Sequence, residues 1–211
     1  GSGGSITFWI KGESGLASRT FITKFQADTE NYQVGFTNSA PFFAFKSASG
    51  NGIFLGDQVS GLTSGYHHFA FSIDDSSTAN FLANTKIYHN ASDTGKFLGG
   101  AANSAASTDM DNGGSLQFGK STNASFTLVS EMNEIAFFDT RLTPANVTAI
   151  YNSGVPFDLT SNDGDYNVSS NLQLYLTGEE TPIGASPTFT ITDSTGNHSV
   201  FGGNTIIDST L

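Results

Sequence analysis

Hydrophobic residues in this chain alternate with polar ones over short segments, and this period of two constrains the fold more than any other feature. Residues 5–11 read SITFWIK, so that Ile6, Phe8 and Ile10 share one face of an extended segment. Comparable segments return at intervals of roughly 8–12 residues, the spacing of a β-sandwich or barrel rather than of βαβ units. They lie at residues 20–26, 31–37, 41–47, 52–59, 66–73, 85–90, 115–119, 125–130, 131–138, 171–176 and 188–192.

One segment breaks the alternation and predicts a short α-helix near residues 143–152. Thr143 is a suitable N-cap, and Pro144 fits the first helical position because it has no N–H to leave unpaired. Gly154 follows at a point where a left-handed residue can end the helix. Asn146 stands where a capping box has Glu or Gln, so we expect an incomplete box.

Charge excludes two classes of partner. The chain has 8 Lys and Arg against 19 Asp and Glu, for a formal net charge of −11. Nucleic acids and anionic membrane surfaces both require clustered basic residues, so we expect neither as a partner. No apolar run approaches the ~20 residues of a membrane span, so no membrane insertion is expected. The absence of cysteine excludes disulfides, cysteine-ligated zinc and thiol catalysis.

The two ends of the chain carry separate expectations. Residues 1–4 resemble a linker or a cloning scar, and the first strand pattern begins immediately after them, so we expect the chain to derive from a longer protein. We interpret residues 5–211 as one domain. Residues 171–211 either close its sandwich or begin a following repeat; closure is favoured because a stray half-domain would expose apolar edges.

Four motifs resemble those of a known fold family. They read YHHFAFSID (66–74), TKIYHN (85–90), LQFGKS (116–121) and SEMNEIAFFDTRLTPANVTAIYNSG (130–154). In order, spacing and helix context they are similar to the laminin-G-like, concanavalin A-like superfamily. The resemblance implies an all-β fold, an antiparallel jelly-roll β-sandwich with one short α-helix. The family pattern has Asp where this chain has Asn133, so a polar or metal role at that position does not carry over.

Catalysis is not expected from this member of the superfamily. Glucanases with a similar fold carry an E-x-D-x-E pattern on one strand, which places two carboxylates beside the scissile bond. Here the three positions are Glu131, Asn133 and Ile135, so only the first carboxylate is present. By simple alternation Glu134 should point to the opposite face from Glu131. A glycoside hydrolase-like enzyme is therefore a distant alternative.

The histidines predict no site. His67 and His68 are adjacent, so on a strand they face opposite sides and cannot chelate one metal together. His89 and His198 lie in other segments. We expect satisfied hydrogen bonds or contacts with solvent at all four.

Calcium is the one metal that the sequence favours, because loops rich in Asp, Asn and Gly supply the oxygen ligands that it prefers. Domains of the laminin-G-like kind often hold calcium at a loop rim. Two loops qualify, although neither completes an EF-hand frame, and solvated turn residues are the alternative interpretation. The predicted ligands are Asp109, Asp111, Asp163 and Asp165.

A saccharide site in this fold would use an exposed aromatic platform surrounded by polar groups. Trp9 is the leading candidate, although a buried Trp in the second layer of a sandwich is an equal alternative. The complete set of predicted ligand-binding residues is Trp9, Tyr32, Tyr66, Tyr88 and Asn112.

These patterns predict a non-catalytic surface-recognition module, carbohydrate-binding or adhesive, within a larger extracellular or virion-surface protein. Its partner would be a glycan or another cell-surface ligand. The alternative is a structural component of a phage particle, such as a capsid decoration or a tail fibre, whose partners are neighbouring subunits of the assembly. Fold resemblance alone does not separate the two, because one fold serves many functions.

Overall fold

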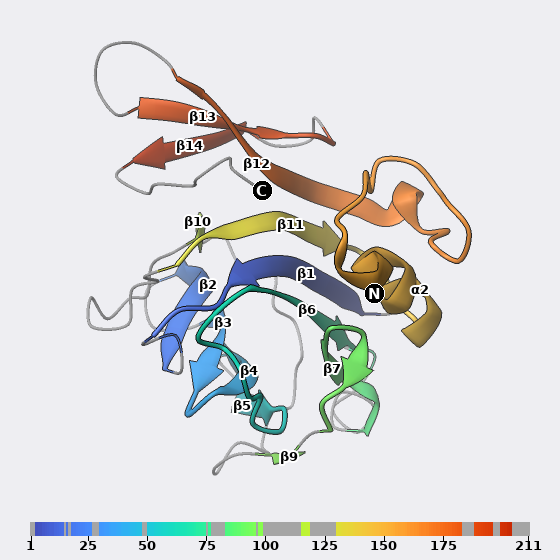
Figure 1. Cartoon of the computed structure of the whole chain (residues 1–211). Coiled ribbons are helices and arrows are strands. Elements are labelled where there is room, and N and C mark those ends of the chain that lie inside the picture. Colours follow the sequence, from blue (N-terminus) through green and yellow to red (C-terminus); the bar gives the residue numbers. More distant parts are fainter. Residues whose placement is uncertain are drawn as a thin grey trace.

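In the computed structural model of the chain, two antiparallel β-sheets stack face to face (Figure 1). The structure describes residues 3–14, 16, 18–26, 30–47, 50–74, 76, 83–95, 97–98, 115–118, 130–182, 188–195 and 199–203. The eight-stranded sheet has the order β14 (Ser199–Gly203), β13 (Thr188–Asp193), β12 (Leu172–Pro182), β11 (Met132–Phe138), β1 (Gly4–Lys11), β6 (Tyr66–Ile73), β7 (Lys86–His89) and β8 (Ser92–Asp93). The six-stranded sheet has the order β10 (Ser115–Phe118), β2 (Arg19–Gln26), β3 (Glu30–Thr37), β4 (Ala40–Ser47), β5 (Gly50–Leu55) and β9 (Phe97–Leu98).

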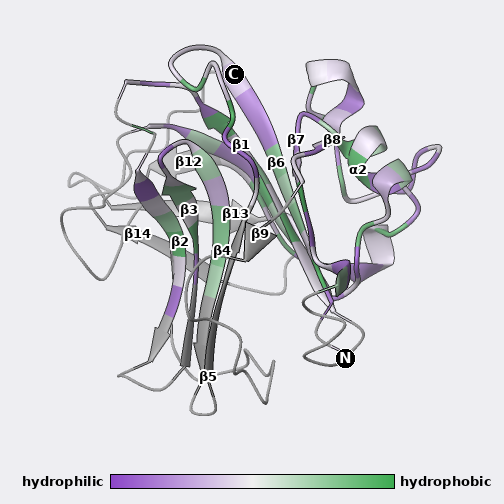
Figure 2. Ribbon diagram, turned by 90° about the horizontal axis from the view of Figure 1, so that it is seen from below, coloured by the Kyte–Doolittle hydropathy of each residue, from purple (hydrophilic) through white to green (hydrophobic). Residues whose placement is uncertain are grey.

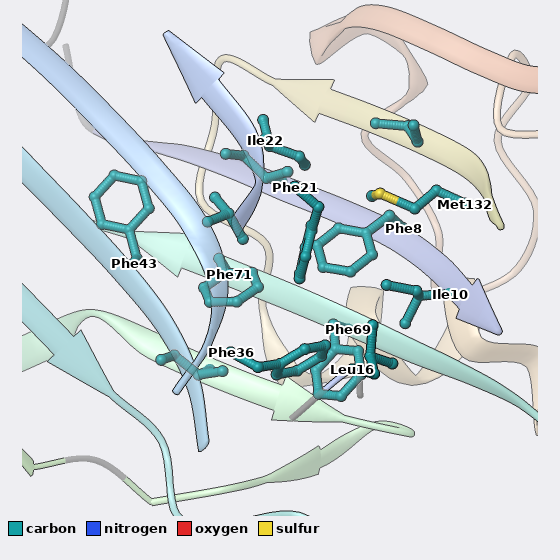
Figure 3. Packing of buried hydrophobic residues seen from close by; sticks show 14 of the residues in the cluster. Phe8, Ile10, Leu16, Phe21, Ile22, Phe36, Phe43, Phe69, Phe71 and Met132 are labelled. Atoms are coloured by element: carbon teal, nitrogen blue, oxygen red, sulfur yellow. The ribbon is translucent and has the colours of Figure 1, made fainter. Parts of the chain in front are cut away.

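Phenylalanine fills the space between the two sheets (Figure 3). Phe8 of β1 is fully buried and contacts Phe21 edge-on, with ring centroids 5.1 Å apart. It stacks on Phe69 of β6 at 5.9 Å. Ile6 and Ile10 lie in the same cluster, as their alternation with polar residues predicts. Each such side chain contributes about 1.5–3 kcal/mol on burial, so the core is the main source of stability.

A second layer covers the outer face of the eight-stranded sheet. Helix α2 (Pro144–Tyr151) stands beside this sheet, on the side away from β2 to β5 (Figure 2). Val147 and Ile150 of α2 pack with Phe138 of β11 and with Tyr166 of the following segment. That segment contains two short 3-10 turns, η2 (Asn152–Gly154) and η3 (Ser169–Asn171). The central strands are therefore buried on both faces.

The predicted helix is confirmed, but its predicted incomplete capping box is wrong. Thr143 is the N-cap, and its Oγ1 accepts a hydrogen bond from the Asn146 backbone N–H at 3.2 Å. The Asn146 Oδ1 accepts the Thr143 backbone N–H at 3.1 Å, which completes the box. Asn can replace Glu because its Nδ2 donates to the Asp165 carbonyl at 2.7 Å and to Asn167 Oδ1, which turns Oδ1 towards the cap. The left-handed stop begins at Asn152, before Gly154.

The predicted strands are largely confirmed, with two qualifications. Residues 125–129 of the predicted strand 125–130 lie outside the described residues, whereas the strands β8, β9 and β14 were not predicted. The first part of β12 pairs with β11, and Leu174 and Leu176 enter the core there. How residues 171–211 divide between this domain and another stays a prediction. None of the helices within the described residues has the length and hydropathy to span a bilayer.

A partly buried ion pair ties the end of β6 to the segment that leads into α2, with Asp74 enclosed and the Arg141 side chain 36% exposed. Arg141 Nη1 lies 3.0 Å from Asp74 Oδ2, and Arg141 Nη2 donates to the Asn84 carbonyl at 3.0 Å. Asp74 also accepts hydrogen bonds from Ser76 and Asn84, which, together with the Arg141 charge, hold its pKa below the usual value against the opposing effect of burial. The carboxylate is therefore ionised and fully engaged in the folded protein.

We expect Asp74→Ala to lower the free energy of unfolding by about 2 kcal/mol, because the hydrogen-bond donors of Ser76 and Asn84 then lose their acceptor in a partly buried site. Urea unfolding followed by circular dichroism measures the change. The matched control is Asp93→Ala, because Asp93 pairs with Lys86 at 2.7 Å but its side chain is 38% exposed. That exposed pair should contribute less than about 1 kcal/mol. Equal losses of unfolding free energy in the two variants would contradict the view that Asp74 holds the end of β6 to the segment before α2.

Candidate functional site

Two irregularities in neighbouring strands distort the outer face of the eight-stranded sheet. Between the pairs Thr7↔Ala136 and Trp9↔Asn133, β11 has one residue more than β1, and Glu134 adopts a left-handed φ of 51° there. The next strand, β12, shifts its register against β13 between Leu176 and Glu180. Bulges bend a strand and redirect its side chains, and they are frequent beside functional sites.

A cavity of about 570 Å³ lies over these two irregularities, and we call it the bulge pocket. Its walls come from β11, from β12, from the segment after α2 and from the turn after β13. This volume is within the range of pockets that hold small ligands. The lining residues are Asn133, Glu134, Pro156, Phe157, Asp158, Thr160, Tyr175, Thr177, Gly178 and Ser194.

Asn133 is the most unusual polar residue in the bulge pocket. It is 1% exposed, and neither its Oδ1 nor its Nδ2 has a hydrogen-bond partner within the described residues. An unsatisfied buried amide costs roughly 1–3 kcal/mol, so proteins seldom retain one without a use for it. Asn133 belongs to the pocket lining, so its enclosed donor and acceptor lie directly behind the surface that a ligand would touch.

Glu134 faces the same pocket, and its predicted orientation is wrong. The Tyr175 hydroxyl donates a hydrogen bond to Glu134 Oε2 on the outer side of the sheet. Glu131 also lies on the outer side, where it pairs with Lys11 and accepts the Tyr66 hydroxyl at 2.8 Å. The bulge shifts the alternation by one residue, so the two glutamates do not point to opposite faces.

Two further ionisable groups of the pocket lining, Tyr175 and Asp158, have opposite pKa shifts. Burial, together with the hydrogen bond to Glu134 and its charge, raises the pKa of the Tyr175 hydroxyl far above its usual value, so this group stays protonated and donates. Asp158 Oδ1 accepts hydrogen bonds from the Thr160 hydroxyl at 2.7 Å and from the Thr160 backbone N–H at 2.8 Å. These bonds lower the pKa of Asp158, so its carboxylate stays ionised.

A small recess continues from the bulge pocket towards the sheet, and Trp9 and His68 line it. Trp9 is 4% exposed and stacks on Tyr151 of α2, with ring centroids 5.8 Å apart. His68 is 0% exposed, and neither ring nitrogen has a partner among the described residues. Burial, with a smaller effect of the His89 charge, lowers the pKa of His68 to about 3. Asn133, Trp9 and His68 thus form a row across β11, β1 and β6.

The structure does not gather the predicted aromatic residues into one exposed platform. Trp9 lies under α2, which is the alternative given by the sequence, and Tyr88 is buried in the outer cluster. Tyr66 is half-buried beside Glu131. Tyr32 belongs to β3, and its side chain lies outside what the structure describes. Among the described side chains of this set, Trp9 alone comes close to the bulge pocket, beneath its floor.

The predicted calcium ligands fall partly outside the structure. Asp109, Asp111 and the predicted ligand-binding Asn112 lie outside the described residues. Asp163 and Asp165 are exposed in a turn closed by the Asp163↔Tyr166 bridge. In the described part of the chain no three His, Asp or Glu side chains are grouped so as to hold a metal ion, so this turn does not provide a complete site by itself. Calcium at these loops stays a prediction.

Sequence reasoning missed the residues that form the bulge pocket. Phe157 and Asp158 come from a polar connection without periodicity, and Tyr175 belongs to a strand that was predicted only as part of the core. The one available signal was Asn133, the departure from the family pattern. An alternation rule cannot anticipate the bulge next to it.

Comparisons with known proteins give the fold. No protein-family model matches the chain, and no curated protein matches it. Its structure is similar to the binding domain of botulinum neurotoxin serotype D, at a TM-score of 0.52 and 14% identity over 73% of this chain and 36% of that one. It is also similar to the binding domain of botulinum neurotoxin DC in complex with SialylT, at a TM-score of 0.51 and 13% identity over 72% and 35% of the two chains. A SAP-like pentraxin from Limulus polyphemus gives 0.49 and 12% over 71% and 70%.

The chain therefore has the concanavalin A-like jelly-roll fold, as the sequence motifs implied. The matched part of the chain spans about a third of each neurotoxin domain. At this level of identity the likeness establishes the fold and nothing about the ligand.

The buried His68 predicts a specific loss of stability in acid. Its folded pKa of about 3 lies below the unfolded value of 6.5, so the unfolded chain binds the proton first as the pH falls. Its contribution to stability is complete above pH 6.5 and is lost progressively from there towards pH 3. We expect His68→Gln to reduce the pH dependence of the unfolding free energy between pH 6 and 4.5 by about 1.4 kcal/mol per pH unit.

Urea unfolding at several pH values measures this slope. The control is Thr7→Val, which changes another buried and unpartnered polar group of the same face without removing a titrating one, and it should keep the wild-type slope. An unchanged slope in His68→Gln would contradict the assignment of a buried neutral imidazole.

Proposed function

We propose that this chain is a non-catalytic surface-recognition module that binds a neutral saccharide in the bulge pocket. The observation that carries the proposal is the unpartnered amide of Asn133, buried in the wall of a pocket of about 570 Å³. A donor and an acceptor on one rigid side chain match a pair of adjacent sugar hydroxyls, each of which can donate and accept.

The rest of the lining has the chemistry of a saccharide site. Phe157 is half-buried and offers an apolar surface to the C–H face of a sugar ring. Thr160, Thr177 and Ser194 add side-chain hydroxyls around it. Asp158 is ionised and can accept hydrogen bonds from sugar hydroxyls. Such directional polar groups fix the orientation of a bound ligand and provide specificity.

Charge favours a neutral ligand over an anionic one. The described lining contains two carboxylates, those of Glu134 and Asp158, and no Lys, Arg or His. The chain as a whole carries a formal net charge of −11. A sialylated or uronic-acid ligand would meet like charge both at a distance and in the pocket, and repulsion at contact costs several kcal/mol.

The carboxylates of the pocket are poorly suited to glycoside hydrolysis. A glycosidase needs a general acid whose pKa is raised so that it carries a proton near neutral pH. The hydrogen bonds from Thr160 lower the pKa of Asp158 instead. The Glu134 carboxylate is already engaged as the acceptor of the Tyr175 hydroxyl. These features support binding without catalysis.

In this proposal the module belongs to a larger extracellular or virion-surface protein, and its partner is a glycan of a cell surface. The fold is compatible with ligand recognition, since a neurotoxin binding domain of similar fold was determined in complex with SialylT. Calcium held by the loop aspartates, Asp163 and Asp165 among them, would act at the rim and not through the bulge pocket. A binding assay in calcium and in chelator separates these two contributions.

The test uses a glycan array followed by calorimetry with the neutral oligosaccharide that binds best and with its sialylated counterpart. We expect binding of the neutral form, at least tenfold weaker binding of the anionic form, and a loss of tenfold or more in Asn133→Ala. Because Asn133 is unsatisfied in the described structure, the same substitution should leave the free energy of unfolding unchanged or raise it.

Asn171→Ala is the matched control, because Asn171 donates to Asp139 at 2.8 Å outside the pocket lining. It should bind like the wild type. Wild-type affinity in Asn133→Ala would contradict the site. A blank array from a protein that forms a stable homo-oligomer would overturn recognition in favour of the assembly role.

A further inference from the structure

A pair of histidines occupies the face of the eight-stranded sheet opposite to the bulge pocket. His67 of β6 and His89 of β7 are diagonal neighbours, since His89 pairs directly with Phe69. His67 Nδ1 and His89 Nε2 are 2.9 Å apart, and both side chains are half-buried. The sequence did not predict this pair, because the two residues come from segments 22 residues apart.

The surrounding contacts assign the protons of this pair. His67 Nε2 lies 3.0 Å from the Ser64 carbonyl, which can only accept, so the neutral tautomer of His67 that satisfies this contact has its proton on Nε2. Its Nδ1 then holds a lone pair, and His89 Nε2–H donates to it. A single proton thus lies between the two ring nitrogens in this tautomer.

We propose that His67 Nδ1 and His89 Nε2 together bind a divalent transition-metal ion, preferentially Cu²⁺ or Ni²⁺, in place of that shared proton. On binding, the His89 proton moves from Nε2 to Nδ1 of the same ring. The Nε2 lone pair then binds the ion, and the charge of the ring does not change. Neutral imidazole is the form that ligates metals.

The distance between the two nitrogens selects the geometry. Metal–imidazole bonds are about 2.0–2.1 Å long, so nitrogens 2.9 Å apart subtend an angle of about 90° at a shared ion. Square-planar and tetragonal sites, which Cu²⁺ and Ni²⁺ prefer, have this angle between adjacent ligands. Tetrahedral zinc would need a separation of roughly 3.3–3.4 Å at the same bond lengths.

The environment of the pair holds the rings in place. The hydrogen bond from His67 Nε2–H to the Ser64 carbonyl is the outer contact that metal-ligating histidines commonly make. The His89 ring stacks on Phe69, with centroids 4.9 Å apart, which limits its rotation. No third His, Asp or Glu joins them among the described residues, so water or an external donor would complete the coordination. The result is an open site.

Copper titration of the whole chain at pH 7.4 tests this inference by calorimetry and electron paramagnetic resonance. We expect one Cu²⁺ per chain, hyperfine coupling to imidazole nitrogens, and a rise in the melting temperature, because the ion binds the folded state. Ni²⁺ should bind at least as tightly as Zn²⁺. Either His67→Gln or His89→Gln should weaken Cu²⁺ binding tenfold or more.

His68→Gln is the matched control, because His68 is adjacent in sequence but lies in the recess on the other face of the sheet. It should retain Cu²⁺ binding. Absence of binding and of any thermal shift in the wild type would overturn the inference without reliance on a variant. Wild-type affinity in either His67→Gln or His89→Gln would overturn it as well.

Discussion

Burial of both faces of the central strands is the constraint on which the rest of this structure depends. Phe8 faces the other sheet and is fully buried, whereas its neighbour Trp9 faces α2 and is buried as well. A sandwich normally leaves the outer face of each sheet in water, where polar residues need no partner within the protein. Here α2 and the segment after it exclude that water, so each polar group of the outer face needs a protein partner or a ligand.

The outer face meets this requirement only in part. Near the start of α2, the Ser5 hydroxyl donates to the Thr140 carbonyl, and the Ser72 hydroxyl donates to the Leu142 carbonyl. Among the described residues, Thr7 Oγ1 of this face and Arg141 Nε of the segment before α2 have no hydrogen-bond partner, and neither do the side chains of Asn133 and His68. Asn133 and His68 lie at the bulge pocket and its recess, and such local inconsistencies are typical of functional sites.

The sequence predicted features that depend on neighbouring residues, and it missed features that depend on how distant strands pair. Alternation is local, so it predicted β1 and the inward direction of Ile6, Phe8 and Ile10. The bulge at Glu134 depends on how three strands pair, and a glutamate with positive φ leaves no mark in a pattern of hydrophobic residues. The His67–His89 contact depends on the register of β6 against β7, which the turn between them does not reveal.

The rule that organises the fold also separates its two proposed sites. Successive residues of a strand face opposite sides, so His67 and His68 share a peptide bond but lie in different environments. His68 is enclosed beneath the bulge pocket, and His67 is half-buried beside His89. A ligand on one face therefore need not disturb the other. The bulge pocket itself occurs where the rule fails, because only a shifted register brings the consecutive residues Asn133 and Glu134 into one pocket. In a sandwich whose strands alternate inward-facing and outward-facing residues, a bulge that breaks this alternation is thus the place to look for a binding site.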